Sequence, residues 1–312
     1  MKKPKVHVLL STYNGEKYLR EQLDSIFDQT YENFTLYIRD DGSTDQTLEI
    51  IKQYEKDNEA ASGRIKLLEH GEGKNIGWQR SFWLLLEQCG GADYYAFCDQ
   101  DDVWLPKKIE VAVDMLQEEE NNKPLLYYAN YNYCDENLNI GHEAPRPHLP
   151  LEFKDVMMYT PAFGFAIVIN EKLRCKCLET TDKTGLAHDG WVQKIAASMG
   201  KILYDETSVA LYRRHGNAVT SGNSGITASI VYWLKQEVFG NKMKQEIHYP
   251  LDRFLQEYGE QISEQNRNIL TLFAGKTENP MKWFKRLTFP KRLRPSMGGE
   301  VALRVCFFLN KY

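Results

Sequence analysis

Short apolar runs alternate with helical patterns between residues 6 and 120, and this alternation limits the fold more than any other feature of the sequence. The runs at 6–10, 34–38, 65–70 and 94–98 are predicted to be strands. Parallel strands need a long crossover, usually a helix, and such crossovers are right-handed. We therefore expect an α/β fold with a mostly parallel central sheet flanked by helices.

The helices between these strands are expected at 16–29, 43–56, 78–89 and 106–120. Ser43 and Gln46 have the spacing of a capping box, which predicts that the second helix starts there. A mixed pattern follows, in which "FGFAIVI" (163–169) is one of the expected strands, and the last part of the chain has helical patterns. We expect two parts, a domain of residues 1–222 and a helical C-terminal extension of residues 223–312.

Small, polar and acidic residues follow each of the four predicted strands. The segments are "STYNG" (11–15), "RDDGSTD" (39–45), "GEGKNIG" (71–77) and "DQDD" (99–102). In open α/β sheets, ligands bind beyond the carboxyl ends of the strands. Four such segments at one edge of the sheet predict a binding site there.

The acidic segment places Asp99, Asp101 and Asp102 within four positions, and it has three interpretations. A calcium loop of the EF-hand type would need a glycine where Trp104 stands, and Pro106 starts a helix inside the loop. A helix cap needs one carboxylate, whereas three repel one another. A Mg²⁺ or Mn²⁺ site, completed by substrate phosphates, supplies the positive charge that such a cluster needs, and the role of Asp102 stays open between support of the site and helix capping. The residues alone favour a metal-dependent enzyme acting on a phosphorylated or nucleotide ligand.

The overall composition narrows the class of protein and its surroundings. A net charge of −4 and a pI of about 6.0 argue against a general nucleic-acid binder. The six cysteines form no CxxC pair, so we expect reduced thiols in a cytoplasmic protein. No stretch approaches the roughly 20 apolar residues that span a bilayer. We expect a protein that acts in solution or on a membrane surface.

Four motifs in order resemble those of glycosyltransferase family 2, whose members have the GT-A fold. They are "LLSTYNG" (9–15), "IRDDGSTD" (38–45), "FCDQDDVWLPKK" (97–108), and "AHDGW" (187–191) followed by "YRRHG" (212–216). The resemblance covers roughly residues 4–220, and the last pairing is most similar to bacterial rhamnosyltransferases. It implies that residues 1–222 form a GT-A catalytic domain.

The resemblance also implies a pocket for a nucleoside-diphosphate sugar, linked to dTDP or UDP. Thr12, Tyr13 and Asp41 would contact the nucleobase, and Asp40 and Asp99 would lie near the ribose and the sugar. The remaining expected pocket residues are Ser11, Asn14, Asn75, Gly77, Arg213 and Arg214, the two arginines being available to the leaving diphosphate. A simpler interpretation of Asp40 and Asp41 is that, with Ser43, they form a turn and a helix cap.

The same resemblance assigns the metal and the base. Asp101 would be the main protein ligand of Mn²⁺ or Mg²⁺, and His215 a further metal or phosphate contact, unless it is an exposed loop residue. Asp189 would be the general base of an inverting transfer, which needs one carboxylate to take the proton of the acceptor hydroxyl. Its alternative is a simple helix N-cap.

The C-terminal segment is basic and rich in aromatic residues. Residues 276–312 carry nine Lys or Arg against two acids, among Trp283, Phe284, Phe289, Phe307 and Phe308. This composition is typical of an anchor on an anionic membrane, and equally of a docked helical tail or a contact between two copies in a homodimer. A membrane contact would suit a lipid-linked glycan acceptor.

We expect an inverting, metal-dependent glycosyltransferase of cell-surface polysaccharide biosynthesis, transferring a sugar such as rhamnose to a glycan or lipid-linked glycan. It would lie in the cytoplasm or on the inner face of the plasma membrane. One alternative is a nucleotidyltransferase that makes the sugar nucleotide, but the loop after the first strand has one glycine and one lysine. The other is a non-enzymatic, receiver-like module, which would be much shorter than 312 residues.

Overall fold

The computed structural model describes residues 3–68, 74–214, 240, 243–275 and 279–311. Contacts divide the chain into two compact units. The first consists of Met1–Arg146, Ala162–Ala196 and Gly200–His215, and the second of Pro147–Pro161, Ala197–Met199 and Gly216–Tyr312. The expected boundary between residues 222 and 223 falls outside the described residues, so it stays a prediction.

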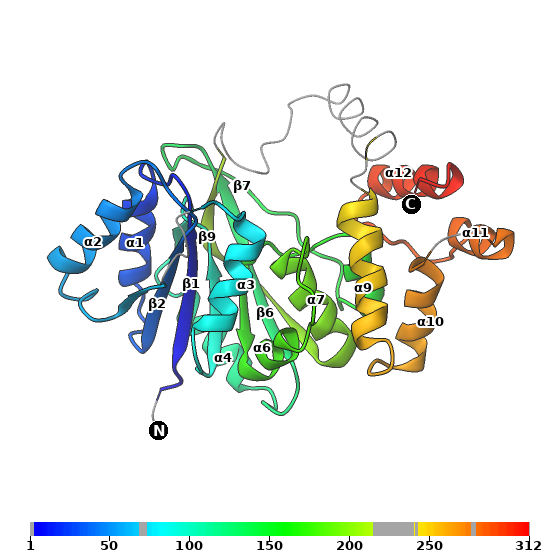
Figure 1. The fold of residues 1–312 in the computed structure, drawn as a ribbon, viewed down its shortest axis with the longest axis horizontal. Helices are drawn as coiled ribbons and strands as arrows, with labels where there is room; N and C mark the ends of the chain where they lie inside the picture. The colour runs from blue at the N-terminus through cyan, green and yellow to red at the C-terminus, as the bar shows by residue number, and fades with distance from the viewer. Residues whose placement is uncertain (1–2, 69–73, 215–239, 241–242, 276–278, 312) are drawn as a thin grey trace. The chain divides into compact units, whose positions relative to one another are not determined.

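In the described part of the first unit, nine strands form one sheet (Figure 1). The strands are β1 (Val6–Thr12), β2 (Phe34–Asp40), β3 (Ile65–Leu67), β4 (Tyr94–Cys98), β5 (Val103–Trp104), β6 (Leu125–Cys134), β7 (Ile140–Glu143), β8 (Ile167–Asn170) and β9 (Lys201–Arg213). Their order is β3-β2-β1-β4-β8-β6-β9-β5, and β7 pairs with β6. The first four strands are mutually parallel and β6 is parallel to β9, whereas β8 is antiparallel to both its neighbours. The predicted, mostly parallel sheet is confirmed.

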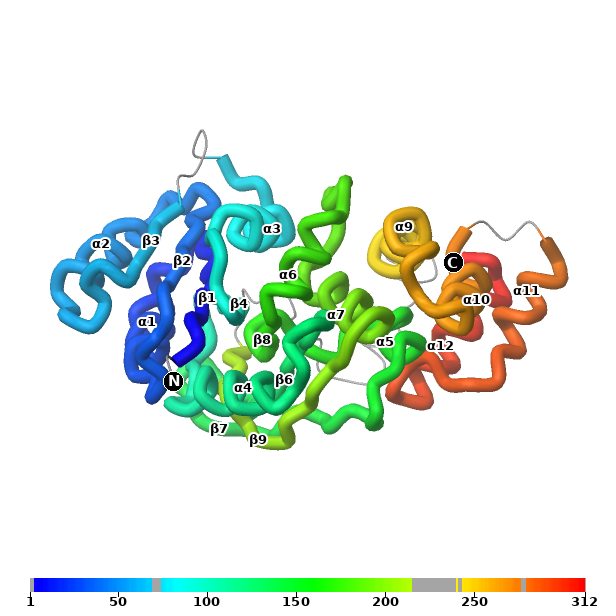
Figure 2. The backbone as a smooth tube through the Cα atoms, turned by 90° about the horizontal axis from the view of Figure 1, so that it is seen from below, coloured from blue at the N-terminus to red at the C-terminus, as the bar shows by residue number. Residues whose placement is uncertain are grey.

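Helices cover both faces of this sheet, as Figure 2 shows. The helices are α1 (Leu19–Phe27), α2 (Thr47–Asp57), α3 (Trp78–Gln88), α4 (Lys108–Gln117), α6 (Glu171–Leu178) and α7 (His188–Met199). Val6, Val8 and Leu10 of β1 share a core with α1, α2 and α4 on one face. On the other face, Phe97 of β4 meets Phe82 of α3 with ring centroids 5.9 Å apart. Successive side chains of a strand point to opposite faces of the sheet, and helices cover both faces. Nearly every position of these strands is therefore apolar, which explains the continuous apolar runs.

Two local predictions are wrong. Of the strand expected at 163–169, Gly164–Ala166 form a short 3₁₀ helix, and the strand β8 begins at Ile167. The capping box of Ser43 and Gln46 does not form, because α2 begins at Thr47 and Asp45 accepts the hydrogen bond from the Thr47 amide. Ser43 instead binds residues of the neighbouring loops, as described below.

The described part of the second unit is helical, as the sequence predicts. Its α-helices are α5 (Phe153–Met157), α9 (Tyr249–Tyr258), α10 (Glu264–Phe273), α11 (Pro280–Leu287) and α12 (Met297–Phe308). None of the helices in the described part of the chain has the length and apolarity to cross a bilayer.

Two arginines hold the last three helices together. The buried guanidinium of Arg286 donates to the carbonyl oxygens of Leu272, Phe273, Ala274 and Gly275 at the end of α10. The guanidinium of Arg304 donates to four more carbonyls, those of Arg286, Leu287, Phe289 and Lys291. Cations that satisfy the last carbonyls of a helix stabilise its end. Two of the basic residues counted in the C-terminal segment are therefore part of its framework.

Candidate active site

Hydrogen bonds join the loops that follow β1, β2 and β4. The amide of Tyr13 donates to Oε1 of Gln100 at 2.8 Å, and Nε2 of Gln100 donates to the Tyr13 carbonyl at 2.9 Å. The amide of Asn14 donates to Oγ of Ser43 at 2.9 Å. A Cβ atom at Gly15 would lie 2.4 Å from Oε1 of Gln100, so any other residue here would displace the Gln100 amide. The expected clustering of the strand ends is therefore present, with Gln100 as a connector that sequence reasoning did not identify.

Asp40, the last residue of β2, organises the turn that follows it. Its buried carboxylate accepts hydrogen bonds from Oγ1 of Thr12, the amides of Gly42 and Ser43, and Oγ of Ser43. Thr12 and Asp40 pair across the β1–β2 ladder, next to the pair formed by Ser11 and Arg39. This geometry supports the turn-forming interpretation of Asp40, and a contact with the ribose stays a prediction.

Asp41 connects the second loop to the third. Its Oδ1 accepts from Nη1 of Arg39 at 2.7 Å and from the Ile76 amide at 2.9 Å, and its Oδ2 accepts from the Gly77 amide at 2.7 Å. Gly77 has a φ of 88°, which side chains other than glycine rarely adopt, and Oδ1 of Asn75 accepts from the same amide at 3.1 Å. Asp41 is 1% exposed and holds the second and third loops together, and its contact with a nucleobase stays a prediction.

Arg39 is a site residue that the sequence analysis missed. Both members of its ion pair with Asp41 are buried, and its Nη1 also donates to Oγ of Ser81 at 2.6 Å. A charged residue in a strand covered on both faces is rarely buried without a partner. The arginine directly before the two aspartates was the available signal.

The electrostatics bring the acidic loop after β4 together with the start of α7. Burial, then the charges of Asp101 and Asp189, raise the pKa of Asp99 to about 7. Burial raises the pKa of Asp189 to about 6, and the Gly190 amide and Lys194 partly oppose this rise. Two carboxyl groups far apart in sequence thus share one partly desolvated site, and both titrate near neutrality.

The start of α7 fixes the position of Asp189. The N-cap of α7 is Ala187, so the simple N-cap interpretation of Asp189 is wrong: it lies in the first turn, and its Oδ1 accepts from the Gly190 amide at 2.7 Å. The neighbouring buried ring of His188 stacks on Phe82, with ring centroids 4.0 Å apart. Burial lowers the pKa of His188 to about 3, so the ring is a neutral packing element that holds the helix start against α3.

Arg213 lies beneath the acidic loop and supports it. Its guanidinium donates to the carbonyl oxygens of Asp101 at 2.8 Å and Glu136 at 2.6 Å, and pairs with Glu21 of α1 at 2.5 Å. Its amide donates to Oδ1 of Asp102 at 3.1 Å, and the residue is 1% exposed. Arg213 therefore positions the loop, and a contact with the diphosphate stays a prediction.

The other basic candidates lie farther along the chain. The guanidinium of Arg214 lies over the ring of Tyr133, 5.7 Å from its centroid, and its amide donates to the Cys134 carbonyl. His215, the second expected metal contact, lies outside the described residues.

Asp102 points away from solvent. It is fully buried, and burial, followed by the charges of Asp101 and Asp99, raises its pKa well above the ordinary value. Lys108 is equally buried, with its Nζ 4.8 Å from the centroid of the Trp104 ring, and burial lowers its pKa to about 8. Asp102 therefore belongs to the support of the loop, together with Arg213 and Lys108.

The chemistry of the loop fits a divalent cation whose shell the substrate completes. Among the described residues, no group of three or more His, Cys, Asp or Glu side chains has the arrangement of a metal site. Mg²⁺ and Mn²⁺ commonly take one or two carboxylates, and phosphate oxygens and water fill the other positions. Asp99 and Asp101 crowd each other electrostatically, and a cation would relieve this repulsion.

Comparisons of the sequence with known proteins identify its family. The family model for Glycosyl transferase family 2 matches residues 7–166. The dTDP-rhamnosyl transferase RfbG of Shigella flexneri is 35% identical over 235 residues, which are 70% of this chain and 76% of that protein.

Two further relatives match over shorter stretches. The putative glycosyltransferase EpsE of Bacillus subtilis (strain 168) is 40% identical over 114 residues, 36% of this chain and 39% of the relative. The UDP-Glc:alpha-D-GlcNAc-diphosphoundecaprenol beta-1,3-glucosyltransferase WfgD of Escherichia coli is 29% identical over 136 residues, 44% of this chain and 49% of that enzyme. The match to each of these two proteins spans less than half of its length.

Solved structures show the same fold. TarS 1-349 of S. aureus in complex with UDP-GlcNAc superposes with a TM-score of 0.58 at 15% identity, over 98% of this chain and 90% of that one. The mannosyltransferase PcManGT of Pyrobaculum calidifontis, in complex with GDP-Man and Mn²⁺, superposes with a TM-score of 0.53 at 13% identity, over 100% of this chain and 82% of that one. The predicted GT-A fold is confirmed.

Proposed function

The chain belongs to glycosyl transferase family 2, and from this membership we propose that it is an inverting, metal-dependent glycosyltransferase of cell-surface polysaccharide biosynthesis. Its donor would be a dTDP- or UDP-linked sugar, with rhamnose as the first candidate, and its acceptor a glycan or lipid-linked glycan. Membership of the family rules out both the nucleotidyltransferase and the receiver-like module. We place the reaction in the cytoplasm or at the inner face of the plasma membrane.

The hydrogen-bonded meeting of the loops after β1, β2 and β4 carries this proposal, and the electrostatic interaction between Asp99 and Asp189 supports it. The loop after β4 would hold the sugar and the diphosphate, and Asp189 lies close enough for its charge to raise the pKa of Asp99. A base for the acceptor hydroxyl is needed beside the donor sugar. The pKa of Asp189, about 6, lets it be ionised at neutral pH and still take a proton.

The proposed reaction is a single displacement. The carboxylate of Asp189 accepts the proton of the acceptor hydroxyl while the hydroxyl oxygen attacks the anomeric carbon. The bond from that carbon to the diphosphate breaks on the opposite face, so the configuration inverts and a nucleoside diphosphate leaves. A divalent cation bound at Asp101 would neutralise negative charge on the diphosphate. Arg213 keeps the Asp101 backbone in place through its hydrogen bond to the carbonyl.

Names of relatives support the choice of donor and acceptor. RfbG is described as a dTDP-rhamnosyl transferase, and it matches most of this chain. WfgD is described as acting on a diphosphoundecaprenol-linked sugar, which makes a lipid-linked acceptor the second part of the proposal. We further propose that Asp41, expected from the family resemblance at the nucleobase, accepts from the imide N–H of thymine or uracil.

Nucleotide binding and transfer can be tested separately. In a thermal-shift panel with Mn²⁺, dTDP should stabilise the protein more than UDP or GDP, because a ligand that binds the folded state raises its stability. Asp101→Ala should abolish the metal-dependent part of this shift. Asp189→Asn should keep the shift and lose sugar transfer. Asp57→Asn, a change of an exposed carboxylate on α2, is the matched control and should alter neither.

Two results would contradict the proposal. Transfer at the wild-type rate by Asp189→Asn would remove Asp189 from the role of base. A larger thermal shift with UDP or GDP than with dTDP would remove rhamnose as the first candidate, but it would not contradict the proposed transfer reaction.

A further inference from the structure

The outward side of α12 is apolar along its whole length. The exposed residues of the helix and its C-cap are Met297, Gly298, Val301, Val305, Phe308 and Leu309. Their spacing of three or four residues places them on one side of the helix. None of them is charged, whereas the exposed side of a helix in water normally carries charged and polar residues. We call these six residues the apolar face.

The neighbouring helix α11 continues this pattern. Met281 and Phe284 are 61% and 55% exposed, on successive turns of α11. Nε1 of Trp283 donates to the Phe307 carbonyl at 2.9 Å, and the rings of Trp283 and Phe308 are 6.1 Å apart. The two helices are therefore held against each other, and both present large apolar side chains to solvent. Exposed apolar surface of this extent marks an interaction site.

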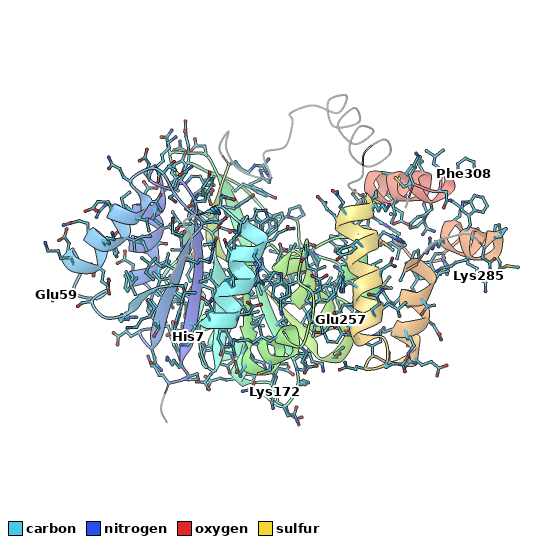
Figure 3. The ribbon with its side chains drawn as sticks, in the orientation of Figure 1. His7, Glu59, Lys172, Glu257, Lys285 and Phe308 are labelled. Atoms are coloured by element: carbon cyan, nitrogen blue, oxygen red, sulfur yellow. The ribbon has the colours of Figure 1, made fainter. Side chains whose placement is uncertain are left out.

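Among the described residues 279–311, positive charge accompanies the apolar face and no exposed carboxylate does, and Glu278 lies outside the described residues. Lys285, Lys291, Arg292 and Lys311 are exposed, and Figure 3 labels Lys285 and Phe308 on this unit. The single acid between residues 279 and 311 is Glu300. It is buried, and it accepts hydrogen bonds from the amides of Leu293 and Arg294 and from Arg304. The outer surface of these helices is therefore apolar and cationic.

We propose that the apolar face of α12, with the exposed side chains of α11, docks this chain onto an anionic lipid surface. The apolar side chains enter the boundary between headgroups and acyl chains, and the four exposed cations contact the anionic headgroups. This binding goes beyond the sugar transfer and does not depend on it. Arg286 and Arg304 take no part, because their guanidinium groups are committed to backbone carbonyls. Lys276, also counted in the basic segment, lies outside the described residues.

A lipid surface suits this face better than a second copy of the chain. In a symmetric dimer the same patch meets itself, so the exposed cations of two copies would face each other. Such juxtaposition of like charges opposes association. An anionic bilayer instead supplies negative charge at the rim and an apolar layer beneath it.

The test is co-sedimentation of the full chain with vesicles of phosphatidylcholine, with and without phosphatidylglycerol. The wild type should bind the anionic vesicles and should release as salt rises, because salt screens the charges. Val301→Ser/Phe308→Ser should weaken binding more than tenfold. Lys285→Gln/Lys291→Gln/Arg292→Gln should weaken it on the order of a hundredfold, from roughly fivefold for each cation.

Matched variants on the first unit provide the controls. Ile140→Ser removes an equally exposed apolar side chain of β7, and Lys52→Gln/Lys66→Gln/Lys172→Gln removes three exposed cations. Both should bind anionic vesicles as the wild type does. Circular dichroism and metal-dependent dTDP binding show that each variant is folded. Asp101→Ala should lose that dTDP binding and keep vesicle binding, so a failure of the transferase proposal is distinguishable from a failure of this one.

Three outcomes would overturn the inference. The first is a wild type that does not bind anionic vesicles, and the second is equal loss of binding in the control and test variants. The third is a Val301→Ser/Phe308→Ser variant that binds vesicles normally but changes from dimer to monomer by light scattering. That result would assign the apolar face to a contact between two copies.

Discussion

The charge of Asp189, which is partly buried, should destabilise the folded protein at neutral pH, so Asp189→Asn should stabilise it. The pKa of Asp189 lies at about 6 in the folded protein, above its ordinary value of 3.8, because burial disfavours the ionised form. The folded state therefore binds more protons than the unfolded state between these two pH values. The free energy of unfolding falls as pH rises through this window and levels off above about pH 6.

The size of the effect follows from the pKa difference. One pKa unit corresponds to about 1.4 kcal/mol, so ionised Asp189 costs the folded state up to about 3 kcal/mol above pH 6. About 2 kcal/mol of this cost should develop between pH 4.5 and pH 8. Asp189→Asn lacks it and keeps an oxygen that can accept from the Gly190 amide. Loss of the Asp189 charge also removes its repulsion of ionised Asp99, which further stabilises the folded protein.

Urea unfolding of both proteins at pH 4.5 and pH 8 measures this difference. The fluorescence of Trp83 and Trp191 reports on the first unit, because both side chains are buried there. The advantage of Asp189→Asn over the wild type should be about 2 kcal/mol larger at pH 8 than at pH 4.5. An advantage that is the same at both pH values would refute the reasoning, and so would an equal pH response in Asp57→Asn.

Three further changes test the supports of the site. Gly15→Ala should lower stability by about 1 kcal/mol, because its Cβ would displace the Gln100 amide from its hydrogen bonds with Tyr13. In Gln100→Ala, which has lost these bonds already, Gly15→Ala should cost less in urea unfolding, and additive losses would contradict the close contact. Arg213→Lys should weaken Mn²⁺ binding in the presence of dTDP by about 10–100-fold in calorimetric titration. The reason is that lysine cannot form both the hydrogen bond to the Asp101 carbonyl and the ion pair with Glu21. Binding of dTDP without metal should be unchanged, and an equal loss of both kinds of binding would count against a positioning role. Between pH 7 and pH 5, His188 should lower the free energy of unfolding of the wild type by about 2 kcal/mol, because its pKa is about 3 in the folded protein and 6.5 ordinarily. His188→Leu should lack this dependence of stability on pH. An unchanged dependence would show that the His188 ring is accessible to protons.

The sheet could be predicted because its strands are covered on both faces. The run at 94–98 is apolar at every position, and β4 occupies those residues. Two-residue β5 has no such signal, since a periodic pattern needs more positions. The capping box failed for a different reason. Ser43 had suitable local spacing, but Asp40 and the Asn14 amide of the neighbouring loops bind its hydroxyl.

In the site, too, features that follow from a sequence pattern could be predicted, and features that depend on tertiary contacts could not. The position of the acidic loop at a strand end follows from topology, whereas the electrostatic interaction of Asp99 with Asp189 joins residues far apart in the sequence, and only the family resemblance had placed Asp189 in the site. Gln100 and Lys108 carried no signal, because each is a single residue whose partner lies on another element or in the buried interior. The guanidinium of Arg213 binds two backbone carbonyls and Glu21, contacts that the sequence did not predict, and its expected contact with the diphosphate stays a prediction. Sequence alone does not show whether a charged group faces substrate or protein.

The pairing of Tyr13 with Gln100 has an evolutionary consequence. The middle residue of the acidic motif fastens one loop to another, and the space that it fills is left by the missing side chain of Gly15. A lineage that replaced Gln100 alone would lose both hydrogen bonds, and one that replaced Gly15 alone would displace the Gln100 amide from them. The two positions should therefore change together during descent, whereas exposed residues far from the loops can drift independently.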